Sequence, residues 1–226
     1  KVYVISTSGY QNSFLEVRKK IFQIIGDMGM QGIGYELNDY GITPFSTISN
    51  NCSNNMNSAD LFLIFLNDRY GYIEGNDSKS VTHLEIELAI ASEKPCLIFA
   101  QDTLMDLLNY PNLSGLESDP RYSSIIKADN FEKLITLLKQ LTSHNVVFRY
   151  QHDDIEGIAE LVKSKIEALT DYFIIRYLEK SKDRILAFYN NLPYNNASNS
   201  VPVLYRSQGN YSTQDLHSLC VSKLES

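Results

Sequence analysis

The run LFLIFL, residues 61–66, decides the fold class of this chain. Each position in it is apolar, so a strand built from it has no face that suits water. Strands of this kind occur in parallel sheets whose two faces are both covered by helices. The run is also far shorter than the about 20 apolar residues that cross a bilayer. We therefore predict a buried central strand and no membrane span.

Four further strand-like runs lie before and after this one, and helical patterns separate them. The strand-like runs are KVYVIS (1–6), GIGYEL (32–37), CLIFA (96–100) and VVFRY (146–150). The helical patterns cover residues 12–29, 80–93 and 130–141, with a weaker, Asn-rich one at 47–58. This alternation predicts an α/β fold, in which a flavodoxin-like, doubly wound parallel sheet contains five strands.

The strand pattern stops after residue 150. A helical pattern covers residues 153–192, and a polar linker near 193–202 and a short amphipathic helix follow it. The first apolar stripe of the long helix consists of Ile155, Ile158, Ala159, Val162, Ile166 and Leu169. We therefore expect an α/β domain at 1–150 and a helical extension at 151–226.

Charge and cysteine content exclude some classes of partner. The net charge of −7 argues against a broad basic surface for duplex nucleic acid. The three cysteines, Cys52, Cys96 and Cys220, are far apart and have no histidine at zinc-ligand spacing, which favours reduced thiols and no metal site. The first residues have the pattern of a strand rather than of a signal peptide. We expect a cytoplasmic protein.

In sheets of this type, ligands bind beyond the carboxyl ends of the strands. The segments expected at this rim are STSGY (6–10), residues 67–80 and AQDT (100–103). Ser6, Thr7 and Ser8 follow the first strand, where hydroxyl and backbone N–H groups can bind a phosphate at the N-terminus of the next helix. The alternative for these residues is an ordinary helix cap.

Arg69, Tyr70 and Gly71 follow the central strand. Arg69 can bind a phosphate through two parallel hydrogen bonds, or it can tie the loop to a nearby carboxylate. Tyr70 can stack on a base or a ribose, or it can pack within the loop. Gly71 marks a backbone position that needs a positive φ.

The helical pattern at 80–93 places a carboxylate beside its apolar face. Its predicted sheet-facing residues are Val81, Leu84, Leu88 and Ala91. Glu85 falls on the adjacent stripe with Thr82, at the edge of this face, whereas His83 and Glu87 project to the far side. Ser80 and Thr82 add hydroxyl groups at the start of the helix and are candidates for nucleotide binding. The alternative for Glu85 is a simple interaction with the helix dipole.

Four separated motifs in residues 1–100 resemble a TIR-like family. The motifs are Ser6-Thr7, Glu16 with Arg18, Arg69-Tyr70-Gly71 and Thr82-His83-Leu84-Glu85. That family is known as a domain of unknown function at the N-terminus of bacterial NACHT or STAND-type ATPases and defence proteins. The chain departs from the family pattern at Ile5, where a first Ser is usual, and at His83, where an acidic residue is common.

The segment from Thr82 to Ala89 is also similar to the Thr-x-x-Glu-x-Gly-x-Ala stretch of nucleoside deoxyribosyltransferases. Those enzymes use the Glu at the anomeric carbon of a nucleoside. TIR NAD hydrolases have a Glu on the corresponding helix, so the resemblance implies Glu85 as the catalytic carboxylate. Glu87 replaces the transferase glycine, which counts against transferase chemistry itself.

Cleavage of an N-glycosidic bond passes through an oxocarbenium-like ribosyl centre, which a carboxylate stabilises. Nicotinamide in NAD carries a positive charge and leaves as a neutral base, so one carboxylate suffices without a metal or a cofactor. We therefore expect an NAD glycohydrolase or a synthase of a cyclic ADP-ribose-type signal, with NAD as substrate. The resemblance implies a role in bacterial antiphage or stress defence, with self-association or a defence-system partner.

Two other functions fit the same residues. The chain can be a non-catalytic TIR-like module for assembly or nucleotide sensing, in which case the helices after residue 150 provide the partner surface. It can also be a hydrolase or transferase that acts on the N-glycosidic bond of nucleosides or nucleotides. The substrate that is cleaved, and the effect of replacing Glu85, distinguish the three.

Overall fold

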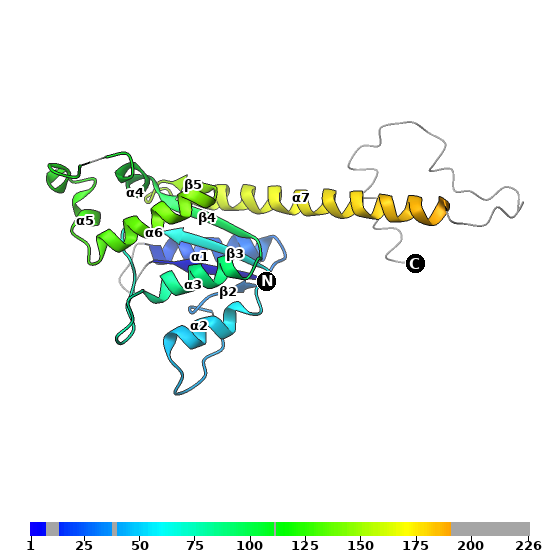
Figure 1. Cartoon of the computed structure of the whole chain (residues 1–226), viewed down its shortest axis with the longest axis horizontal. Coiled ribbons are helices and arrows are strands. Elements are labelled where there is room, and N and C mark those ends of the chain that lie inside the picture. Colours follow the sequence, from blue (N-terminus) through cyan, green and yellow to red (C-terminus); the bar gives the residue numbers. More distant parts are fainter. Residues whose placement is uncertain (8–13, 38–39, 111, 191–226) are drawn as a thin grey trace, which may run out of the picture. The chain divides into compact units, whose positions relative to one another are not determined.

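The computed structural model of the chain describes residues 1–7, 14–37, 40–110 and 112–190 (Figure 1). Ser8, Cys220, the expected linker near 193–202 and the expected terminal helix lie outside the described residues.

A five-stranded sheet forms the centre of the fold. Its strands are β1 (Val2–Ser6), β2 (Gly32–Ile33), β3 (Leu61–Leu66), β4 (Cys96–Gln101) and β5 (Val147–Tyr150). Their order is β2-β1-β3-β4-β5, and every neighbouring pair is parallel. The predicted parallel α/β sheet is thus confirmed, although β2 is shorter than the run expected at 32–37. The strand order reverses between β1 and β3, which is where such sheets bind ligands.

Helices connect the strands and cover both faces of the sheet. They are α1 (Phe14–Asp27), α2 (Ile48–Met56), α3 (Val81–Ala91), α4 (Asp102–Leu107), α5 (Ser123–Ile126), α6 (Phe131–His144) and α7 (Ile155–Asn190), with a short 3-10 helix at Leu116–Ser118. Among the described residues, no helix has both the length and the apolar character needed to span a membrane.

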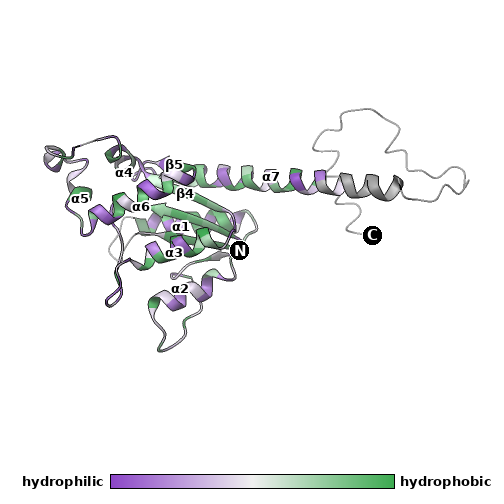
Figure 2. Cartoon of the chain, viewed as in Figure 1, coloured by the Kyte–Doolittle hydropathy of each residue, from purple (hydrophilic) through white to green (hydrophobic). Residues whose placement is uncertain are grey.

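Two hydrophobic cores, one on each face, explain why the strands are mostly apolar (Figure 2). Tyr3 and Ile5 of β1 pack in the first core, with residues of α2 to α6. Val2 and Val4 pack in the second core, with residues of α1 and α7. Successive side chains of a strand point to opposite faces, so both sets must be apolar.

The first part of α7 belongs to this compact unit, which comprises Lys1–Ile175. Ile158, Val162 and Ile166 of the predicted apolar stripe are buried in the second core. The compact unit thus continues beyond residue 150, where we expected the helical extension to begin. A second unit comprises Arg176–Ser226, and α7 continues into it as far as Asn190.

The buried face of α3 differs from the predicted one. Leu88 is 45% exposed and Ala91 is exposed, whereas Glu85, Ile86 and Ala89 are buried. The prediction failed because this helix carries apolar residues on nearly every side, so their spacing does not identify one face. Glu85 consequently lies within the buried face of α3 and not at its edge.

Candidate functional site

The carboxylate of Glu85 lies in the first core, where β1 meets α3. The residue is 9% exposed, and its Oε1 accepts a hydrogen bond of 2.7 Å from the hydroxyl of Tyr3. Tyr3 reaches it because the side chain of this β1 residue points to the face that α3 covers. A carboxylate in such surroundings needs hydrogen bonds to replace those of water.

Two further polar groups complete what we call the carboxylate cluster, namely Tyr3, Tyr40, Cys52 and Glu85. The hydroxyl of Tyr40, which follows β2, donates to Sγ of Cys52 at 3.2 Å and lies 3.4 Å from the hydroxyl of Tyr3. Cys52 is a buried residue of α2. The segment after β2 and helix α2 therefore join β1 and α3 around the carboxylate.

Burial changes the protonation of every member of this cluster. Desolvation raises the pKa of Glu85 above its ordinary value of 4.5, and the Tyr3 hydrogen bond, the Cys52 thiol and the charge of Arg18 partly offset it. Desolvation and the nearby Glu85 raise the pKa of Cys52 to about 12. Burial also raises the pKa of both tyrosines. The surroundings thus favour the protonated form of all four groups.

A buried arginine holds the segment after β2 in place. Arg18 of α1 is 1% exposed, and its Nε and Nη2 donate to the two carboxylate oxygens of Glu36 at 2.5 and 2.8 Å. Its Nη1 donates to the carbonyl of Val4 and to the hydroxyl of Ser6. Glu16, the other residue of the Arg18 motif, instead contacts Lys19 at 2.7 Å.

Three predicted site residues meet where β1 ends. The hydroxyl of Thr82 donates to the carbonyl of Ser6 at 3.3 Å. Gly71 has φ +96, and a Cβ at this residue would lie 3.1 Å from the hydroxyl of Thr82. Glycine thus allows the loop after β3 to approach the first turn of α3 closely.

Thr7 and Arg69 have opposite environments. Thr7 is 1% exposed, and its hydroxyl accepts the backbone N–H of Asn67 at 2.8 Å, which joins the ends of β1 and β3. Arg69 is exposed and makes no hydrogen bond or ion pair within the described part of the chain. Arg69 is therefore available to a ligand, whereas Thr7 is engaged in the fold.

Tyr70 and Ser80 fix the start of α3. The Ser80 hydroxyl accepts the backbone N–H of His83 at 3.1 Å as an N-cap and donates to the carbonyl of Tyr70 at 2.7 Å. The hydroxyl of Tyr70 contacts Nδ1 of His83 at 2.6 Å, and both residues are buried. These bonds orient α3 and hence Glu85, which lies one turn further along.

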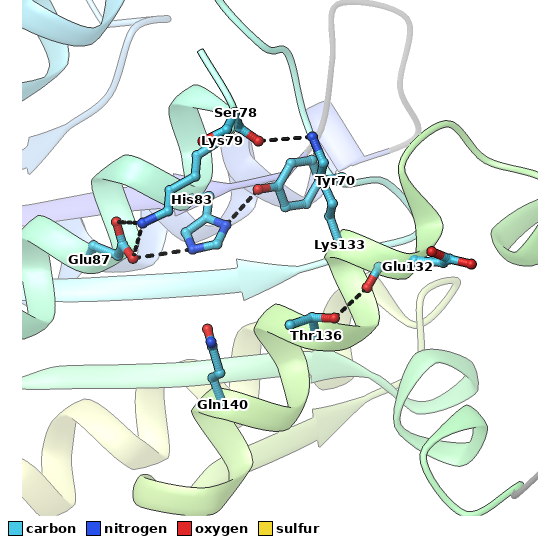
Figure 3. A pocket seen from close by; sticks show the side chains of 9 residues that line it. All are labelled: Tyr70, Ser78, Lys79, His83, Glu87, Glu132, Lys133, Thr136 and Gln140. Carbon is cyan, nitrogen blue, oxygen red and sulfur yellow. Dashed lines mark hydrogen bonds and ion pairs between the residues drawn. The ribbon is translucent and has the colours of Figure 1, made fainter.

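A cavity of about 370 Å3 lies between the start of α3 and helix α6 (Figure 3). Its lining residues are Tyr70, Ser78, Lys79, His83, Glu87, Glu132, Lys133, Thr136 and Gln140. Glu87 accepts two hydrogen bonds from Lys79 and lies 3.4 Å from Nε2 of His83. Tyr70 is thus the predicted site residue at this cavity, and Glu85 is not among its lining residues. No group of acidic, His and Cys side chains in the described ranges has the arrangement to hold a metal ion.

The partners of Glu85 could not be predicted from the sequence. Tyr3 offered a weak signal, since it places a hydroxyl group in an otherwise apolar run. Tyr40 and Cys52 lie in a segment without clear periodicity, and Glu36, the partner of Arg18, falls in the run expected to be a strand at 32–37. Only the tertiary fold brings these residues together.

The pairing of Arg18 with Glu36 yields a stability prediction. Arg18→Met leaves the largely buried Glu36 without its cation, so we expect a loss of about 3–5 kcal/mol in the free energy of unfolding. The matched control, Lys19→Met, removes the exposed ion pair with Glu16 on the same helix and should cost less than about 1 kcal/mol. Urea unfolding followed by circular dichroism measures both, and equal losses would contradict the structural role of Arg18.

Comparison with known families finds one match. The model of a family described as a domain of unknown function (DUF4062) matches residues 1–167, and the chain belongs to this family. The match confirms a domain of unknown function, which is the coarser part of the resemblance. A search of curated proteins finds no match to the chain.

Proposed function

From this family membership and the geometry of the carboxylate cluster, we propose that the chain is a TIR-like, NAD-consuming enzyme. In this proposal it is an NAD glycohydrolase or a cyclic ADP-ribose-type synthase that serves bacterial antiphage or stress defence. The observation that carries the proposal is the buried carboxylate of Glu85, which receives a hydrogen bond from Tyr3. Carboxylates are rarely buried in a protein core, and one with a perturbed pKa is a candidate for a functional site.

The proposed reaction needs a negative charge beside the ribose. The bond between the anomeric carbon and the nicotinamide nitrogen breaks, and its electron pair leaves with nicotinamide, which becomes neutral. Water then bonds to the anomeric carbon and loses a proton to solvent; in the cyclase, a nitrogen of the adenine in the same molecule bonds there instead. Glu85 stabilises the ribosyl cation between these steps.

The raised pKa of Glu85 is consistent with this role. Desolvation favours the protonated carboxyl group while the cluster is closed. A positively charged nicotinamide ribosyl group beside it would favour the ionised form, since an opposite charge lowers the pKa of an acid. Substrate binding and ionisation of Glu85 therefore support each other.

Other residues have supporting roles in the proposal. Arg69, exposed and unpaired among the described residues, is the candidate for binding the substrate phosphates. Ser6, Gly71 and Thr82 form the end of β1 next to α3, where the ribose would approach. Ser8 remains a predicted phosphate contact, and Thr7, Tyr70 and Ser80 would act by holding the loops.

Exposed apolar residues on α7 favour a second function, self-association. Tyr172, Phe173, Ile174 and Ile175 are each 49–51% exposed. Four consecutive apolar residues cover every side of a helical turn, so a monomer leaves several of them in water. A second copy of the chain would cover them, which fits an assembly module with or without catalysis.

The first test is cleavage of NAD. We expect wild-type protein to release nicotinamide and Glu85→Gln to reduce the rate at least about 100-fold, because the cation loses its stabilising charge. Glu87→Gln is the matched control, since Glu87 is an exposed carboxylate on the same helix that pairs with Lys79. Release should be measured over a range of protein concentrations, with free nucleosides in parallel.

Full activity of Glu85→Gln would overturn the assignment of the carboxylate. Cleavage of nucleosides but not of NAD would instead favour the nucleoside hydrolase. Self-association without any cleavage would favour the assembly module.

The second test is the pH dependence of stability. Folding raises the pKa of Glu85 above its ordinary value of 4.5, so its contribution to stability is complete when the pH is below 4.5. This contribution is lost as the pH rises through the pKa that Glu85 has in the folded protein. Glu85→Gln lacks this ionisation, so wild type should lose stability relative to Glu85→Gln as pH rises above about 4.5. Urea unfolding of both proteins between about pH 4 and pH 8 measures the difference, and a constant difference would contradict the raised pKa.

The third test concerns self-association. Phe173→Glu places a charge in the exposed apolar stretch and should shift the protein toward monomer, whereas Ala168→Glu, at an exposed position on the same helix, should not. Light scattering after gel filtration over a range of concentrations measures the mass of both. A wild-type protein that stays monomeric throughout would exclude this surface as a dimer interface.

A further inference from the structure

Three polar side chains lie side by side at the carboxyl ends of β3, β4 and β5. Asn67 follows β3, Gln101 ends β4 and Tyr150 ends β5. The strands pair Leu66 with Ala100 and Gln101 with Tyr150, so the three residues are at the same level. We call them the edge amide group.

All three belong to the face of the sheet that α1 and α7 cover. Tyr150 packs in the second core, as do Phe65 and Phe99, which precede Asn67 and Gln101 by two residues. Side chains two apart on a strand share a face. The carboxylate cluster lies on the opposite face, since Tyr3 packs in the first core. The edge amide group is therefore separate from Glu85.

Two atoms of this group are buried without a hydrogen-bond partner among the described residues, namely Nδ2 of Asn67 and Oε1 of Gln101. Asn67 is 1% exposed. Oγ1 of Thr103, in the first turn of α4, is also buried without a hydrogen-bond partner among the described residues. Buried amide groups in folded proteins nearly always have partners, so two such atoms on neighbouring strands need an explanation.

Exchanging the oxygen and nitrogen positions of the Asn67 amide does not give both atoms a hydrogen-bond partner. The Tyr150 hydroxyl contacts Oδ1 of Asn67 and the carbonyl of Leu66. If the amide is turned by half a rotation, its nitrogen faces the Tyr150 hydroxyl and its oxygen is left without a partner. One polar atom of Asn67 stays unpaired in either orientation.

We propose that the edge amide group binds an uncharged ligand group that presents a donor and an acceptor side by side. Such an edge occurs in a carboxamide and in a nucleobase, and Asn and Gln side chains recognise edges of this kind. Neighbouring strands lie about 4.8 Å apart, which lets one planar group reach both amides. The three side chains carry no charge, so they do not suit a phosphate.

The position of the group agrees with a ligand site. It lies beyond the carboxyl ends of the strands, and the backbone N–H of Asn67 is bound to Thr7, across the point where the strand order reverses. The choice of a nucleotide as the ligand rests on the proposed function. The group would then bind the adenine end of NAD, because the proposed reaction places the nicotinamide end beside Glu85 on the opposite face of the sheet.

Calorimetric titration of the full chain with nicotinamide, adenosine and ribose 5-phosphate tests the proposal. Nicotinamide and adenosine each present a donor and an acceptor side by side, whereas ribose 5-phosphate presents a charged phosphate. We expect nicotinamide or adenosine to bind, and Asn67→Leu and Gln101→Leu each to weaken this binding at least about 10-fold. Gln140→Leu removes an amide from the cavity beside α6 and is the matched control, which should bind like wild type. If Asn67→Leu does not fold, Gln101→Leu decides.

Three outcomes would overturn the proposal. They are binding of ribose 5-phosphate alone, binding of no probe, and binding that neither leucine variant weakens. The same titrations with Glu85→Gln separate this inference from the catalytic one. Retained binding without NAD cleavage would remove the proposed activity and leave the edge amide group intact.

Discussion

The hydrogen bond from Tyr3 to Glu85 is the interaction on which the candidate site depends. An isolated carboxylate in a hydrophobic core is strongly unfavourable, and its first response is to take up a proton. Tyr3 donates to it, and the positive charge of Arg18 also favours its ionised form. These interactions only partly offset burial, so the pKa stays raised and the carboxyl group remains sensitive to any charge that approaches it.

The order of the strands in the sheet brings the residues of the carboxylate cluster together. Tyr3 lies on β1, which has β2 as its neighbour toward one edge of the sheet and β3 as its neighbour toward the other. Helix α3 follows β3, the neighbour of β1, and therefore packs beside the same strand, while α2 and the segment after β2 close the other side. Residues from four parts of the chain thus surround one carboxylate because β1 and β3 are adjacent.

The strands could be predicted because both faces of the sheet are buried, so that composition alone marks β1, β3 and β4. The face of α3 could not be predicted, because Leu88 and Ile90 are exposed while Ile86 is buried, and hydrophobicity ranks the three alike. The pairing of Arg18 was missed for a different reason. Glu16 is its neighbour in sequence, whereas Glu36 reaches it only after β2 has joined the sheet.

The buried polar residues beside β1 and β3 differ in how far the fold itself accounts for them. Thr7, Tyr70 and Ser80 have partners whose loss would disturb a loop or a helix cap, so their presence follows from the fold. Glu85 and Asn67 are different, because each would cost less to the fold as an apolar residue of similar size. Each has a hydrogen-bond partner, Tyr3 for Glu85 and Tyr150 for Asn67, but the pKa of Glu85 stays raised and Nδ2 of Asn67 has no partner among the described residues. Their positions on opposite faces, beside the strands where the order reverses, agree with the two ligand contacts that we propose.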